Sequence, residues 1–133
     1  MGIFRVPILL KNRQNQFLPS EAHGEDVQCD AMVDSGTVQL AFPAEVIEQL
    51  RLLSLDTIMV TTADNCQPTY RVCGMVDLEV QGRRCQVRAI ELPRGAEPLL
   101  GAIPLEEMDW HIDPLGQLVP NPSSPDQPMW LLK

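Results

Sequence analysis

The residues most able to do chemistry lie in the segment Val33-Asp34-Ser35-Gly36-Thr37. An apolar run that ends on an acidic residue places a carboxylate where a strand becomes a turn. Gly36 lets backbone segments approach closely, and the hydroxyls of Ser35 and Thr37 are able to hydrogen-bond around the turn. A carboxylate at the end of a rigid strand is held firmly enough for acid–base catalysis. The segment therefore predicts Asp34 as a candidate catalytic residue, although Asp, Ser and Gly are also common in ordinary turns.

A second motif, Leu99-Leu100-Gly101, lies downstream and precedes a short predicted helix. From about residue 27 to residue 120, the order of motifs, helix and hairpins resembles the retroviral-type (retropepsin-like) aspartic proteases, most closely the small prokaryotic members. The resemblance implies a mostly β fold, a small closed β-barrel of the acid-protease type with one main α-helix and a short C-terminal helix. It also implies that the strand containing Leu100 and Gly101 passes beside the Asp34 turn and supports it.

The same resemblance implies an aspartic endopeptidase. Hydrolysis of a peptide bond by carboxylates needs two of them close together, one as base toward water and one, protonated, as acid toward the carbonyl oxygen. The chain has a single Asp-Ser-Gly and is too short for two lobes, so the second carboxylate must be Asp34 of another copy. The expected assembly is a homodimer with its two-fold axis between the two Asp34 residues. A peptide or protein is the expected substrate, and neither a metal nor a cofactor is expected.

Further roles follow from the resemblance. Ser35 would hydrogen-bond the partner's turn across the axis. Thr37 stands where some family members have alanine, and its hydroxyl is able to bond the outer oxygen of the Asp34 carboxylate.

A flap over the substrate is expected at the tip of a hairpin, formed by Ala63, Asp64, Asn65 and Cys66. Such a flap would exclude water from the reaction. The tip departs from the viral pattern because it has no glycine, but Asn65 is able to take the positive φ that the turn requires.

Short strands separated by close turn signals predict the barrel that would carry these residues. Pro7 should confine the first strand to a sheet edge, and Gly74 should mark a bulge. The best helix is 43–53, with Pro43 at its first position and one apolar stripe that includes Leu53. A short helix is predicted at 104–108. Strands are predicted at 4–10, 28–33, 38–42, 56–62, 67–80, 83–92, 99–100, 110–112 and 117–119.

Composition restricts the class of protein further. The 133 residues suit one domain at 1–119 followed by a proline-rich tail at 120–133, which we expect to be flexible. A net charge of −8 argues against nucleic-acid binding. No apolar run approaches the roughly 20 residues that span a bilayer, and the start lacks the features of a secretory signal. The spacing of the four cysteines matches no zinc pattern, so we expect free thiols and a cytoplasmic location.

Two other hypotheses remain open from the sequence. The same fold could serve as a non-proteolytic dimerisation or peptide-binding module. Alternatively, Asp109, His111 and Asp113 alternate along one predicted strand and could ligate a metal on a single face.

Overall fold

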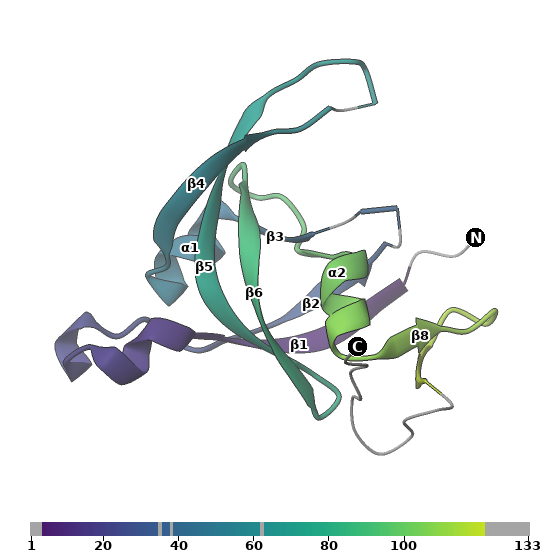
Figure 1. The fold of residues 1–133 in the computed structure, drawn as a ribbon, viewed down its shortest axis with the longest axis horizontal. Coiled ribbons are helices and arrows are strands. Elements are labelled where there is room, and N and C mark those ends of the chain that lie inside the picture. Colours follow the sequence, from purple (N-terminus) through teal and green to yellow (C-terminus); the bar gives the residue numbers. More distant parts are fainter. Residues whose placement is uncertain (1–3, 35, 38, 62, 122–133) are drawn as a thin grey trace, which may run out of the picture.

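The computed structural model describes residues 4–34, 36–37, 39–61 and 63–121 of the chain. Six strands close into a barrel in the order β1-β2-β7-β3-β6-β5, with β5 pairing back onto β1, and β4 extends the sheet beyond β5 (Figure 1). The predicted mostly β fold, with a closed barrel, one main helix and one short helix, is confirmed. The strands are β1 (Phe4–Asn12), β2 (Val27–Val33), β3 (Leu40–Pro43), β4 (Leu53–Met59), β5 (Thr69–Val80), β6 (Arg83–Leu92), β7 (Leu99–Leu100), β8 (Trp110–Ile112) and β9 (Leu118–Pro120). The helices are α1 (Ala44–Leu50) and α2 (Ala102–Glu107), with 3₁₀ turns at Arg13–Phe17 and Ser20–Ala22.

The barrel core follows the alternation seen in the sequence. Val76, Leu78 and Val80 on β5 are fully buried, whereas Asp77 and Glu79 between them are partly exposed. Each aliphatic side chain buried in this way contributes about 1.5–3 kcal/mol of hydrophobic stabilisation. The predicted inward face of β5 is therefore confirmed.

The predicted bulge at Gly74 is also confirmed. The register between β5 and β6 shifts between Cys73 and Val76, on either side of Gly74. A Cβ at Gly74 would lie 3.2 Å from a methyl carbon of Leu55, so a larger residue would crowd β4. A bulge bends its strand, and on the N-terminal side of this one β5 no longer pairs with β1. It pairs with β6 as far as Val72 and forms with β4 a projecting hairpin (Figure 1).

Helix α1 is shorter than predicted at both ends. Pro43 is the extended residue before the helix rather than its first residue. Arg51 ends the helix in the left-handed conformation with φ 53°. The side-chain amide of Asn12 donates to the carbonyl oxygens of Leu50 at 2.9 Å and Arg51 at 3.1 Å, which satisfies the helix end. The prediction that Leu53 belongs to the apolar stripe is wrong, because Leu53 begins β4 and is 56% exposed.

The first strand is longer than predicted and is not an edge along its whole length. Pro7 pairs opposite Asp30 of β2, in the half of β1 that β5 does not reach. The second half, Leu9 to Asn12, pairs with β5 and closes the barrel, and its first two residues, Leu9 and Leu10, pair with β2 as well. The missing N–H of proline is tolerated because it falls in the half of the strand with one partner.

Strands β8 and β9 form a separate hairpin after α2. Arg83 attaches it to the barrel: its Nη1 donates to the carbonyl oxygens of Met108 and Asp109, each at 3.0 Å, and its guanidinium lies 4.8 Å from the ring centre of Trp110. The predicted tail from residue 122 onward lies outside the described residues. None of the helices in the described ranges is long and apolar enough to cross a membrane.

Candidate active site

Asp34 lies where β2 ends, beside the short strand β7. The two strands pair in parallel, with Met32 opposite Leu99 and Val33 opposite Leu100. The N–H of Asp34 donates to the carbonyl oxygen of Leu100 at 3.2 Å. The backbone of Asp34 is therefore fixed by a strand from a distant part of the sequence, and the structure places Leu100 beside the turn as predicted.

Both oxygens of the Asp34 carboxylate accept hydrogen bonds within the turn. The N–H of Gly36 donates to Oδ1 at 2.9 Å, and the hydroxyl of Thr37 donates to Oδ2 at 3.3 Å. The Thr37 N–H donates to the Asp34 carbonyl oxygen at 3.0 Å and closes the turn. A Cβ at Gly36 would lie 3.2 Å from Asp34 Oδ1, so the turn is tight around the carboxylate. Ser35, to which we assigned the contact across the dimer axis, lies outside the described residues.

The far side of the turn is held by α2. The carbonyl oxygen of Thr37 accepts from the N–H of Ala102 at 2.8 Å, and buried Gly101 caps the helix. Leu99 also pairs with Ala41 of β3, so β7 lies between the strands that enter and leave the turn. The half-buried Asp34 side chain is thus oriented by rigid elements on both sides.

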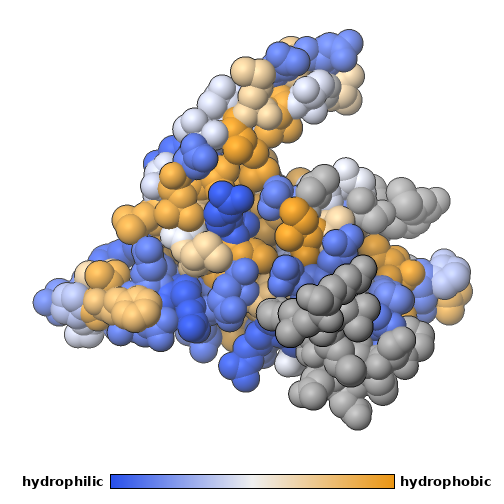
Figure 2. Space-filling view, viewed as in Figure 1, coloured by the Kyte–Doolittle hydropathy of each residue, from blue (hydrophilic) through white to orange (hydrophobic). Residues whose placement is uncertain are grey.

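The hairpin of β4 and β5 extends past the barrel above the loop from β2 to β3 (Figure 1). Val60 N–H donates to the Pro68 carbonyl oxygen at 3.0 Å, which continues the pairing toward the tip. Asn65 has φ 64°, so it supplies the positive φ predicted for it. Ala63, Asp64, Asn65 and Cys66 are all exposed, and the Asp64 carboxylate accepts from Cys66 N–H at 3.3 Å. Figure 2 shows an open notch between this hairpin and the body of the barrel.

An ion pair at the root of the hairpin escaped the sequence analysis. Arg71 of β5 donates from Nε and Nη2 to the two carboxylate oxygens of Glu91 of β6, at 2.7 and 2.6 Å. The hydrogen bond from Arg71 lowers the pKa of the Glu91 carboxyl below its ordinary value. The pair continues the antiparallel register of β5 and β6 beyond Val72 opposite Ile90. The bulge at Gly74 shifts that register by one residue, so an unbroken alignment from the β5–β6 turn would not have placed Arg71 opposite Glu91.

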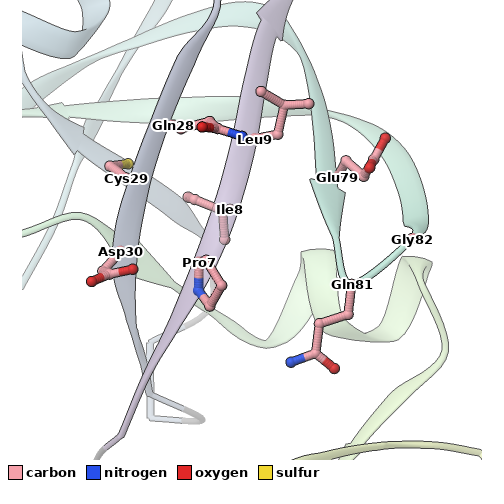
Figure 3. A pocket seen from close by; sticks show the side chains of 9 residues that line it. All are labelled: Pro7, Ile8, Leu9, Gln28, Cys29, Asp30, Glu79, Gln81 and Gly82. Atoms are coloured by element: carbon pink, nitrogen blue, oxygen red, sulfur yellow. The ribbon is translucent and has the colours of Figure 1, made fainter.

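A hollow of about 480 Å³ lies away from the Asp34 turn, where β1 separates from β5 (Figure 3). Its walls come from β1, from β2 on one side and from the β5–β6 hairpin on the other. The carboxylates of Asp30 and Glu79 contribute to it, but no residue of the Asp34 turn does. It is therefore separate from the candidate active site.

The alternative metal ligands are not brought onto one strand face. Only His111 belongs to β8, because Asp109 precedes it with φ 61° and Asp113 follows it. The Asp113 carboxylate accepts the N–H groups of Leu115 and Gln117 at 2.9 and 3.0 Å and so stabilises the turn before β9. Within the described ranges, no group of three or more His, Cys, Asp or Glu residues is arranged to hold a metal ion.

All four cysteines are free thiols. Burial raises the pKa of Cys85 to about 12, and burial likewise raises the pKa of Cys29 and Cys73. These three thiols are therefore protonated at neutral pH and poorly suited to act as nucleophiles.

No protein-family model matches the chain, and no curated protein is significantly similar to it. Functional assignment therefore depends on the geometry around Asp34.

Proposed function

We propose that this protein is an aspartic endopeptidase of the retropepsin-like type, in which Asp34 residues from two copies activate a water molecule. The observation that carries the proposal is the Asp34 carboxylate at a strand end, with Gly36 N–H on one oxygen and the Thr37 hydroxyl on the other. Those bonds fix the plane of the carboxylate, and the side chain is only half-buried.

One chain contributes one such turn, so the reaction requires a homodimer. Two carboxylates in contact share one proton, because both cannot be ionised at close range. The ionised Asp34 takes a proton from water as the resulting hydroxide attacks the peptide carbonyl carbon. The protonated Asp34 of the other copy gives its proton to the carbonyl oxygen. When the tetrahedral intermediate breaks its C–N bond, the leaving nitrogen receives a proton from one Asp34. A hydroxyl of the intermediate gives its proton to the other Asp34, which restores the singly protonated dyad.

The hairpin of β4 and β5 completes the arrangement. A peptide lying in the notch would be covered by Ala63, Asp64, Asn65 and Cys66, and the cover would limit access of bulk water. The free thiols would suit a reducing compartment, and on that ground we propose a cytoplasmic location.

The proposal is tested by incubating the purified protein with a peptide library between pH 3 and pH 8. We expect cleavage by the wild type and none by Asp34→Asn, because asparagine keeps the shape of the side chain but neither accepts nor shares the proton. Asp26→Asn is the matched control, since Asp26 is an exposed carboxylate just before β2 with only a 3.9 Å contact to Lys11.

Equal cleavage by wild type and Asp34→Asn would contradict the proposal. Loss of activity on adding a chelator would favour metal chemistry instead. Peptide binding without cleavage at any pH would favour the non-proteolytic peptide-binding module.

A further inference from the structure

A small hollow of about 40 Å³ lies on the inner side of the curved hairpin. Its lining residues are Gln39, Ile58, Val72, Arg88, Ala89 and Ile90. Gln39 immediately precedes β3 and Ile58 belongs to β4, while β6 and β5 lie between those two strands in the sheet. A hollow in contact with both residues must lie on the concave side, where the sheet curls over itself.

The hollow combines an apolar floor with one cation. Val72 and Ile90 face each other in the register of β5 and β6, and Ile58 adds a third apolar side chain. The volume exceeds the roughly 10–15 Å³ that one water molecule needs, so the end of one short side chain fits. Arg88 supplies the positive charge.

The guanidinium of Arg88 is available to a ligand. A Cβ at Gly74 would lie 3.5 Å from both Cα and Cγ of Arg88, so the base of the arginine packs against the bulge. No hydrogen bond or ion pair of Arg88 occurs among the described residues. The nearest acidic residue on the neighbouring strand, Asp77 opposite Gln86, pairs instead with Arg13 at 3.7 Å. One strand further away, Asp56 opposite Val72 accepts from Thr57 N–H at 2.8 Å.

The position of Arg88 relative to Asp34 follows from the strand order. Asp34 directly follows β2, and β7 and β3 separate β2 from β6, which carries Arg88. Three strand spacings of about 4.8 Å give a path of roughly 14 Å along the curved sheet, which is an upper limit for the separation. An extended peptide advances about 3.3 Å per residue, so this separation corresponds to about four residues of substrate.

We propose that Arg88 is a specificity-determining residue that selects substrates with Asp or Glu about three to four residues from the scissile bond. This inference rests on the proposed function, because it locates the acidic residue relative to cleavage at Asp34. The apolar floor would hold the methylene groups of that side chain while Arg88 pairs with its carboxylate. Since the guanidinium is exposed to solvent, the preference should be moderate, roughly three- to tenfold in kcat/KM over the matching amide.

Two readouts on the full chain test the inference. The first readout is peptide cleavage by the wild type, and the second is peptide binding to Asp34→Asn. Both use pairs of peptide mixtures: one member of each pair contains Asp and Glu, and the other has Asn and Gln at the same positions. Arg88→Gln should abolish the acidic preference in both readouts. Arg84→Gln is the matched control, because Arg84 lies on the same strand opposite Glu79, 76% exposed and away from the hollow, and it should keep the preference.

The outcomes separate the two proposals. If acidic peptides bind better than their amide counterparts, if this preference is lost in Arg88→Gln, and if no peptide is cleaved, the role of Arg88 in recognition is supported and the endopeptidase proposal is overturned. Cleavage with equal handling of acidic and amide peptides, or a preference that persists in Arg88→Gln, would overturn the inference and leave the endopeptidase standing. Neither cleavage nor binding of any peptide would overturn both.

Discussion

Removal of the ion pair at the root of the hairpin should lower the stability of the fold in a pH-dependent way. In Glu91→Gln the side chain keeps its shape but loses the charge that pairs with Arg71. The Glu91 side chain is only 16% exposed, whereas that of Arg71 is 51% exposed, so the pair is partly screened by solvent. For a bidentate, partly exposed ion pair of this kind, we expect the substitution to lower the free energy of unfolding by about 1 kcal/mol at pH 7. In a domain of this size that corresponds to a fall in Tm of about 3–5 °C.

The sign of the pH dependence follows from the pKa of Glu91. The hydrogen bond from Arg71 lowers that pKa from its ordinary value of 4.5, so folding favours the ionised carboxylate. The stabilisation is therefore complete above about pH 5 and is lost as the pH falls through the lowered pKa of the folded state. The difference in stability between wild type and Glu91→Gln should shrink toward pH 3.

The assay is a double-mutant cycle of Arg71→Gln and Glu91→Gln, followed by denaturant unfolding at pH 7 and pH 3. Arg84 and Glu79 provide a control cycle between the same two strands, because their 3.5 Å contact is far more exposed and should give coupling near zero. Coupling of Arg71 with Glu91 that is absent at pH 7, or equal at both pH values, would refute the reasoning.

Two further substitutions test the packing and the turn. Gly24→Ala should lower the free energy of unfolding by at least about 2 kcal/mol, because the new Cβ would lie 2.0 Å from the Leu50 carbonyl oxygen at the end of α1; stability like that of wild type in denaturant would contradict this close approach. Thr37→Val should reduce kcat several-fold while leaving peptide affinity nearly unchanged, because it removes the hydroxyl on Asp34 Oδ2 and keeps both backbone bonds of residue 37; an unchanged kcat would show that this hydroxyl does not orient the carboxylate.

Local patterns in the sequence were enough to predict the regular parts of the barrel. Strand β6 was predicted at its observed bounds, Arg83–Leu92, because turn residues bound it on both sides. The alternation of Val76, Leu78 and Val80 identified the inward face of β5, and Gly74 identified its bulge. These features depend on neighbouring residues alone, which is why a single sequence reveals them.

The errors arose where distant residues decide the local structure. Helix α1 ends at Arg51, where the amide of Asn12, far away in sequence, satisfies its last carbonyl groups. The apolar periodicity through Leu53 continues past this end, so it extended the predicted helix too far. The alternation of Asp109, His111 and Asp113 was misleading in the same way, because the backbone at Asp109 leaves the strand conformation.

The sequence predicted which residues form the candidate site better than it predicted the contacts that hold them in place. The sequence singled out Asp34, Gly36 and Thr37, and the structure joins all three by hydrogen bonds. The bond from Ala102 to Thr37 was not foreseen, because it requires the position of α2 in the finished fold. The Arg88 hollow was missed for the same reason, since its walls come from β4, β5, β6 and the start of β3.

The central claim, that two copies of Asp34 form one catalytic dyad, is tested most directly by mixing subunits. Wild type and Asp34→Asn are combined in equal amounts, allowed to exchange, and assayed for peptide cleavage at constant total protein. Random pairing leaves two Asp34 residues in about one quarter of the dimers, so the account predicts about one quarter of the wild-type activity. Mixtures with Asp26→Asn should keep full activity. Activity of about one half in the Asp34→Asn mixture would show that each chain acts alone and would contradict the account.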